Sequence, residues 1–143
     1  MKRRLDIGDF GLDEFACGCG CGEKRISLEL VKKLQAARTI AGIPFIIASG
    51  ARCEDHNRKV GGSPESEHVP AYMPDNHAHG VDIDTDHPRL HRMGISNSRA
   101  RHLILDALRK AGFTRIGIMR GAIHAGDGET VGAKDPDVTW DYY

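Results

Sequence analysis

The sequence predicts an α+β domain, because two stretches with helical spacing of apolar residues alternate with short apolar stretches of strand length. The order along the chain is helix, strand, long polar loop, strand, helix and a final β-hairpin. The helices are expected over residues 28–41 and 98–111. The strands are expected over residues 44–48, 80–84, 113–119 and 122–124.

Both expected helices have recognisable ends. Ser27 is a typical N-cap residue for the first helix, and Gly42 and Pro44 stop that helix on its far side. The second helix carries one apolar face and is expected to end at Gly112. The apolar face of this second helix consists of Ala100, Leu103, Ile104, Ala107 and Leu108.

The expected strands differ in their patterns. The stretch PFIIA is apolar and β-branched, which is typical of a buried strand, whereas GVDID at 80–84 alternates apolar and acidic residues. A turn at Arg120 and Gly121 joins the two strands of the hairpin. Residues 49–79 are polar and rich in proline, histidine and asparagine. A loop of this length inside a compact domain is usually functional.

Length and composition indicate one ordinary domain. The chain has 143 residues, enough for a hydrophobic core, and no linker-like stretch divides it, so residues 1–143 are expected to form a single domain. Lys and Arg number 20, as do Asp and Glu. This balance argues against a broad nucleic-acid-binding surface, which needs a basic excess. We expect a monomer without a nucleic-acid partner.

The N-terminus contains no recognisable export signal. It reads MKRRLDIGDFGLDEF, which is basic at first but has no apolar run of signal-peptide length. No stretch of the chain approaches the roughly 20 apolar residues that span a bilayer. We therefore expect synthesis in the cytoplasm without a signal peptide, and no insertion into a membrane.

The four cysteines form an unusual pattern. Cys17, Cys19 and Cys21 lie in the sequence CGCGC, whereas Cys53 is distant. This spacing is not the C-x-x-C of a zinc knuckle, and three close thiols with one remote thiol do not suggest a set of disulfides. We expect free thiols in a glycine-rich turn, with a second, structural metal site as the alternative.

Histidines and acidic residues near the predicted strands suggest a catalytic metal. His68 lies in the polar loop, Asp82 on a strand and His124 on the last strand. A catalytic zinc site needs three protein ligands and one open position for water, and two imidazoles with one carboxylate supply suitable donors. The metal lowers the pKa of its water and makes hydroxide available. Spacing alone does not separate such a site from solvated surface residues.

A set of linked motifs carries a family resemblance. In order, the motifs are SGARCEDHNRKVGG, SPESEH, AHGVDI, GFTRIGI and IHAGD, with Trp140 near the end. This series resembles the D-Ala-D-Ala carboxypeptidase family of zinc peptidases, especially its small phage-endolysin and bacterial wall-hydrolase members. The resemblance runs from about Phe15 to Trp140. It implies the fold shared with vancomycin-resistance D,D-dipeptidases and the hedgehog signalling domain, a small antiparallel sheet with helices packed on one side.

The resemblance also implies roles for single residues. One catalytic zinc ion would be held by His68, Asp82 and His124. Arg52 matches the family arginine that holds the carboxylate of the substrate, and we also count it among the catalytic residues. A guanidinium suits this role because it pairs with a carboxylate through two parallel hydrogen bonds. Ser66 is expected either to bind substrate or to brace the loop.

The spacing of the first two ligands departs from the family pattern. His68 precedes Asp82 by fourteen residues, whereas in most members the first histidine precedes the aspartate by seven. An insertion, VPAYMPDNH, would explain the difference. The alternative register pairs His77 with Asp84, which restores the seven-residue spacing but loses the S-x-H and D-I motifs.

The residue that handles protons is a second departure. Many members carry an acidic residue three positions before the last histidine, and this position is Gly121 here. We expect Asp127 to act as the catalytic base, or as a carboxylate that supports a metal ligand. Glu129 and Glu67 are the alternatives.

The function implied by the resemblance is hydrolysis of a peptide bond in the peptidoglycan stem peptide, with zinc-activated water as nucleophile. A D-Ala-D-Ala carboxypeptidase and an L-Ala-D-Glu endopeptidase both fit the motifs. The alternative from another class is a non-catalytic zinc-containing binding module of the same fold, which the missing acid at position 121 favours. A phage enzyme released through a holin pore would reconcile the absent signal peptide with action on the cell wall or in the periplasm.

Overall fold

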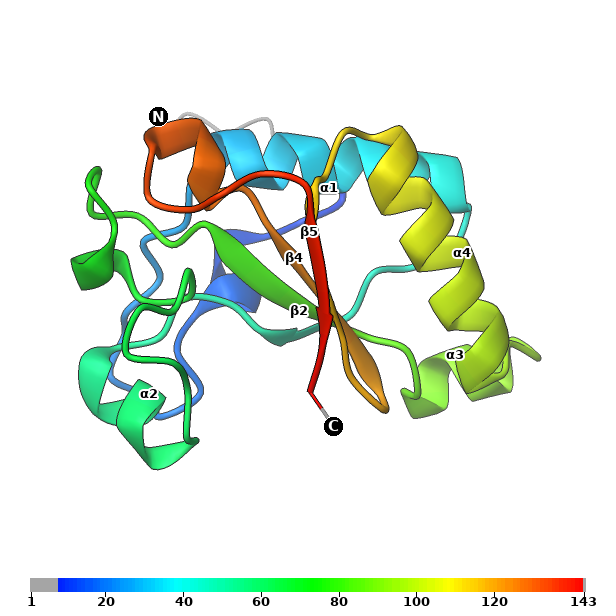
Figure 1. Cartoon of the computed structure of the whole chain (residues 1–143). Coiled ribbons are helices and arrows are strands. Elements are labelled where there is room, and N and C mark those ends of the chain that lie inside the picture. The colour runs from blue at the N-terminus through cyan, green and yellow to red at the C-terminus, as the bar shows by residue number, and fades with distance from the viewer. Residues whose placement is uncertain (1–7, 143) are drawn as a thin grey trace, which may run out of the picture.

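A computed structural model describes residues 8–142 of the chain (Figure 1). Residues 1–7, the first part of the basic N-terminal stretch, and residue 143 lie outside the described residues. The helices are η1 (Leu12–Phe15), α1 (Leu28–Ala41), α2 (Glu54–Lys59), η2 (Pro70–Tyr72), α3 (Pro88–Arg92), α4 (Asn97–Lys110) and η3 (Gly128–Val131). The strands are β1 (Ile47–Ser49), β2 (Gly80–Asp84), β3 (Arg115–Ile118), β4 (Ala122–Gly126) and β5 (Val138–Asp141).

The strands form one sheet in the order β1-β2-β4-β3-β5. Neighbouring strands are antiparallel except β3 and β5, which are parallel. The expected α+β fold is therefore confirmed, but the sheet is mixed and not wholly antiparallel. The chain passes through η3 before it adds β5 at the edge, so β5 runs in the same direction as β3 and not against it.

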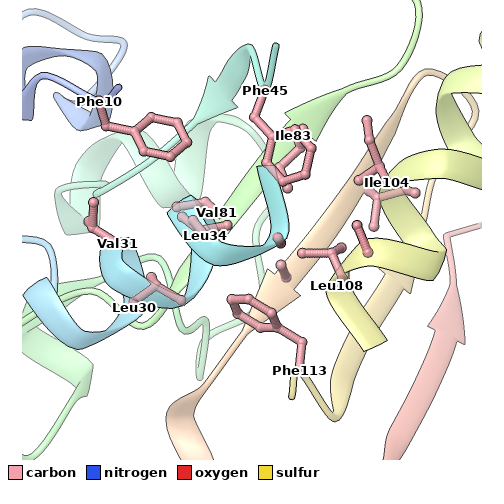
Figure 2. Packing of buried hydrophobic residues seen from close by; sticks show 14 of the residues in the cluster. Phe10, Leu30, Val31, Leu34, Phe45, Val81, Ile83, Ile104, Leu108 and Phe113 are labelled. Atoms are coloured by element: carbon pink, nitrogen blue, oxygen red, sulfur yellow. The ribbon is translucent and has the colours of Figure 1, made fainter. Parts of the chain in front are cut away.

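The two long helices cover one face of the sheet. The Ser27 hydroxyl accepts a hydrogen bond from the Leu30 amide at the start of α1, and Gly42 ends this helix in the left-handed conformation, as the sequence predicts. Helix α4 packs against α1 and against β4. Figure 2 shows the resulting core, to which both helices and the sheet contribute. Its labelled residues are Phe10, Leu30, Val31, Leu34, Phe45, Val81, Ile83, Ile104, Leu108 and Phe113.

Alternation along β2 and β4 gives the sheet an apolar and a polar face. Val81 and Ile83 on β2 belong to the core beneath the helices, as do Ile123 and Ala125 on β4. Because successive strand residues point to opposite faces, Asp82 and His124 face the other side of the sheet. These two residues are direct neighbours across the strand pair. The face opposite the long helices therefore carries the chemistry-bearing side chains.

Some short elements differ from the sequence-based expectations. Helix α2 lies within the predicted loop, and only Asn57 of this helix is buried, so it lacks the apolar stripe that would reveal a helix. Strand β1 is confined to residues 47–49, and α4, capped by Ser96, begins one residue earlier than expected. Within residues 8–142, no helix combines the length and apolarity needed to cross a membrane.

Candidate metal centre

Three side chains of metal-binding type converge on the polar face of the sheet. His68, Asp82 and His124 are all buried. Nε2 of His68 lies 3.2 Å from Oδ1 of Asp82, and Nδ1 of His124 lies 3.0 Å from the same oxygen. The two ring nitrogens are themselves 3.2 Å apart. The three atoms thus form a small and nearly equilateral triangle.

The position of His68 is set by contacts on both sides of the long loop. The Arg52 amide donates to the His68 carbonyl at 2.7 Å, and the His79 amide donates to the carbonyl of Glu67 at 2.8 Å. The Nδ1 atom of His68 lies 2.7 Å from the Gly50 carbonyl oxygen. The loop residue His68 is therefore tied to the segment after β1 and to the start of β2.

The hydrogen bonds behind the triangle determine which ring nitrogens carry protons. The Gly50 carbonyl can only accept, so Nδ1 of His68 donates to it and Nε2 presents a lone pair to the triangle. His124 Nε2 lies 3.1 Å from the Glu67 carboxylate and donates to it, which leaves Nδ1 to face the triangle. Asp82 offers a carboxylate oxygen at the third corner. Three acceptor atoms thus meet at one point, where a proton or a cation must hold them together.

The donor set fits zinc in kind and in spacing. Zinc binds imidazole nitrogen and carboxylate oxygen at about 2.0–2.2 Å in a tetrahedral arrangement, so neighbouring ligand atoms lie about 3.3–3.6 Å apart. The observed separations of 3.0–3.2 Å lie just below this range. Zinc held by these three protein ligands would keep one corner of the tetrahedron open for water, as in catalytic and not in closed structural sites.

Electrostatics at the centre favour a positively charged occupant. Burial lowers the pKa of His124, but its hydrogen bonds to Asp82 and Glu67 outweigh this effect and raise the pKa to about 9. Burial, with the nearby charges of His124 and Arg52, lowers the pKa of His68 despite the opposing effect of Asp82. Burial would raise the pKa of Asp82, but the charges of the two histidines hold it well below its usual range. A metal ion at this centre would therefore displace a proton from His124.

Glu67 supports His124 from behind and is itself held in place. Its Oε2 atom accepts hydrogen bonds from Arg115 Nε at 3.0 Å and from the Gly128 amide at 2.8 Å. Burial would raise the pKa of Glu67, but these donors and His124 lower it to about 2. Gly126 makes room for the carboxylate, since a Cβ atom there would lie only 2.4 Å from Oε1. The result is a carboxylate–histidine pair of the kind that orients metal ligands.

A cavity of about 490 Å³ opens above the centre. Two aromatic residues from the last part of the chain, Trp140 and Tyr142, line it. The Trp140 ring lies 5.3 Å from the His124 ring and equally far from the Arg115 guanidinium. The sequence motifs include Trp140 but assign it no role, because its proximity to His124 depends on the parallel pairing of β5 with β3.

Arg52 and Ser66 lie on the wall of the cavity. Arg52 Nη2 lies 3.4 Å from Oδ2 of Asp82, and Nη1 lies 3.0 Å from Oδ1 of Asn57. The Ser66 hydroxyl accepts a hydrogen bond from the His68 amide at 3.2 Å. Ser66 therefore braces the loop while it also faces the cavity.

Asp127 does not lie at this centre, and its expected role as catalytic base is corrected. It points to the helix-covered face of the sheet, where its Oδ1 lies 2.7 Å from His79 Nδ1 and its Oδ2 lies 3.7 Å from Lys33 Nζ of α1. The physical reason is the alternation of side chains along a strand. Asp127 follows His124 by three residues, so it points to the face of the sheet opposite His124. The alternative Glu129 lies near Thr114 and does not line the cavity either.

His77 and Asp84, the ligands of the alternative register, do not come together as a metal site in the described part of the chain. His77 is exposed, and its ring nitrogen Nδ1 bonds the backbone carbonyl of Asp75 at 2.7 Å. Among residues 8–142, the clusters with metal-binding geometry contain His68, Asp82 and His124 or the four cysteines, but neither His77 nor Asp84.

Replacing Asp127 with asparagine is expected to lower stability without removing metal from the centre. Burial lowers the pKa of His79, but hydrogen bonds to Asp127 and Asp75 outweigh this and raise it. A raised pKa stabilises the fold fully below the unfolded value of about 6.5, and this contribution is lost as pH rises through the folded value. The free energy of unfolding should therefore differ most between wild type and variant at about pH 6. Urea titrations at about pH 6 and pH 9 would measure the difference, and zinc loss from the variant would contradict the assignment.

The family of the chain follows from comparison with known proteins. No curated protein matches the sequence. One family model, described as Peptidase M15, matches residues 8–124, which include the three converging residues and Arg52. This match confirms the resemblance carried by the motifs. The chain therefore belongs to the peptidase M15 family of zinc metallopeptidases.

Proposed function

We propose that the protein hydrolyses a peptide bond in the stem peptide of peptidoglycan, with a zinc ion held by His68, Asp82 and His124. The observation that carries the proposal is the triangle of acceptor atoms beneath a cavity that also presents the Arg52 guanidinium. Zinc held there would polarise the scissile carbonyl and supply a nucleophilic water at neutral pH.

Arg52 supports a substrate with a carboxylate close to the scissile bond. Its guanidinium lies beside the ligand Asp82, so a carboxylate bound to it would lie within a few atoms of the metal position. Ser49 and Asn57 hold the guanidinium through its Nε and Nη1 atoms. A guanidinium held in this way loses little freedom when it binds its partner.

Both candidate bonds in the stem peptide lie close to a free carboxylate. In D-Ala-D-Ala the residue that leaves carries the terminal carboxylate, and in L-Ala-D-Glu the leaving residue carries a free α-carboxylate. Arg52 can therefore orient either substrate by the same contact. The polar wall around Ser66 and the aromatic wall around Trp140 would bind the rest of the peptide.

Digestion of purified sacculi would test the proposal. Released free D-Ala would identify a carboxypeptidase, and new N-terminal D-Glu would identify an endopeptidase, both read by mass spectrometry. The chelator-treated protein and His124→Ala serve as inactive controls. Full zinc occupancy with neither product would overturn the proposed hydrolysis and favour a non-catalytic binding module. We place the site of action at the cell wall, as the substrate requires.

Replacing Arg52 with glutamine is expected to lower kcat/KM for a stem peptide by about 10- to 150-fold, since a hydrogen bond to a charged group contributes about 1.5–3 kcal/mol. Zinc content should stay the same. Arg58→Gln is the matched control, because Arg58 is exposed on α2 and pairs with Asp55 outside the cavity. An unchanged kcat/KM in the Arg52 variant would exclude its role in substrate binding.

A further inference from the structure

The four cysteines meet at one place outside the catalytic cavity. Sγ of Cys17 lies 3.5 Å from that of Cys19 and 3.9 Å from that of Cys53. The sulfur atoms of Cys19 and Cys53 are 3.7 Å apart, and the Cys21 sulfur completes a group in which all atoms lie within 4.8 Å of one another. The fold thus brings the remote Cys53 to the CGCGC segment, which spacing along the sequence does not reveal.

The separations match a tetrahedron of sulfur atoms around one ion. With zinc–sulfur bonds of about 2.3 Å, tetrahedral geometry places neighbouring sulfur atoms about 3.8 Å apart. The three measured separations are 3.5, 3.7 and 3.9 Å. Disulfides would instead need two close pairs with bonded sulfur atoms about 2.0 Å apart. Similar distances among the thiols indicate a shared central partner and not pairwise bonds.

The backbone of the CGCGC segment turns the sulfur atoms to one side. Gly20 and Gly22 have φ angles of +80° and +88°, in the left-handed region that suits glycine. The Gly20 amide donates to the Cys17 carbonyl at 3.1 Å, and the Cys17 amide donates to the Glu23 carbonyl at 2.7 Å. These two turns therefore bring cysteines with C-x-C spacing to one side, although common zinc sites use C-x-x-C spacing.

Backbone amides also point at two of the sulfur atoms. The amide of Glu23 donates to Sγ of Cys21 at 3.4 Å, and that of His56 donates to Sγ of Cys53 at 3.3 Å. Such N–H···S bonds stabilise thiolates and orient them as ligands.

We propose that Cys17, Cys19, Cys21 and Cys53 bind a second zinc ion in a closed tetrathiolate site. Four protein ligands leave no open position for water, so this ion is structural and takes no part in hydrolysis. The four thiols are free of disulfides, as the sequence predicts, and the proposal takes up the alternative of a structural metal.

The second ion would fix the segment that serves the catalytic centre. Cys53 directly follows Arg52, and the Ala51 amide donates to the Phe15 carbonyl at 2.8 Å, two residues before Cys17. Gly50, whose carbonyl orients His68, packs so closely on Phe15 that a Cβ atom there would lie 2.5 Å from its backbone. A zinc ion that links Cys53 to the CGCGC segment therefore holds residues 50–53 in position, on the side of these residues that faces away from the cavity.

Metal analysis of variants tests the proposal. Wild type should contain about two zinc ions per chain, and the double variant Cys19→Ser/Cys21→Ser about one, because both thiols are exposed and their loss removes half of a ligand set. His124→Ala should also retain about one ion, but at the cysteine site. His56→Ala is the matched control with about two ions, because only the backbone of His56 contacts a cysteine sulfur.

Cobalt substitution identifies which ion each variant keeps. Sulfur-to-cobalt charge-transfer absorption should be present in wild type and in His124→Ala, and absent from the double cysteine variant. Zinc release from wild type by a thiol-blocking reagent provides the same information if the cysteine variant does not fold. About one zinc ion in wild type with no charge-transfer band, or a disulfide found by mass spectrometry, would overturn the proposal. Failure of the protein to cleave sacculi would leave the metal count unchanged, so the two proposals fail independently.

Discussion

Replacing His124 with alanine is expected to abolish metal binding at the His–Asp–His centre and to reduce hydrolysis of sacculi by about a thousandfold or more, since a catalytic zinc supplies several kcal/mol of transition-state stabilisation. His124 would contribute one of the three proposed ligand atoms and lies opposite Asp82 across β2 and β4. Two remaining ligands do not hold a zinc ion tightly. Metal analysis after dialysis and the sacculus assay would measure both effects.

His77→Ala is the matched control for this prediction. His77 belongs to the alternative register but is exposed and lies outside both clusters with metal-binding geometry. We expect this variant to keep its metal and its activity. Retained catalytic zinc in His124→Ala, or loss of zinc in His77→Ala, would show that the ligand set proposed here is wrong.

Replacing Glu67 with glutamine is expected to weaken zinc binding at the catalytic centre by about 10- to 100-fold, which is typical when the partner of a metal-ligating histidine is removed. All three partners of the Glu67 carboxylate are donors: the ring of His124, the side chain of Arg115 and the amide of Gly128. The NH₂ group of glutamine would face one of these donors in any orientation. Competition titration with a zinc chelator would measure the affinity.

The same substitution should remove a pH dependence of stability. The pKa of Glu67 is lowered from 4.5 to about 2 in the folded protein. A lowered pKa contributes stability that is present above about pH 4.5 and lost as pH falls towards 2. Wild type should therefore lose about 3 kcal/mol over this range through Glu67, whereas the glutamine variant should not. Urea unfolding at several pH values would test this.

Glu65→Gln is the control for the Glu67 variant. Glu65 also lines the cavity, but its carboxylate is exposed, and its ion-pair partner among residues 8–142 is Lys134 at 4.0 Å. An ion pair at this distance with an exposed carboxylate contributes little to stability. If both variants lost zinc affinity equally, the orienting role of Glu67 would be excluded, and general charge in the cavity would explain the effect.

The sequence alone determined the features that depend on neighbouring residues. The cap at Ser27 and the stop at Gly42 set the ends of α1, because helix ends are satisfied by groups a few residues away. The alternation in GVDID placed Asp82 on the polar face of β2, since side chains alternate along any strand. The ordered motifs indicated the family and led to His68 as the partner of Asp82 across an insertion.

Only the tertiary structure decided how distant segments meet. Asp127 is close to His124 in sequence but lies on the opposite face of the sheet, where it binds His79. Glu67, next to His68, reaches His124 only because β2, β4 and the long loop meet at one point. Cys53 joins the CGCGC segment through the packing of residues 50–53 on Phe15. Each of these contacts depends on long-range strand pairing and core packing, which no local pattern of residues encodes.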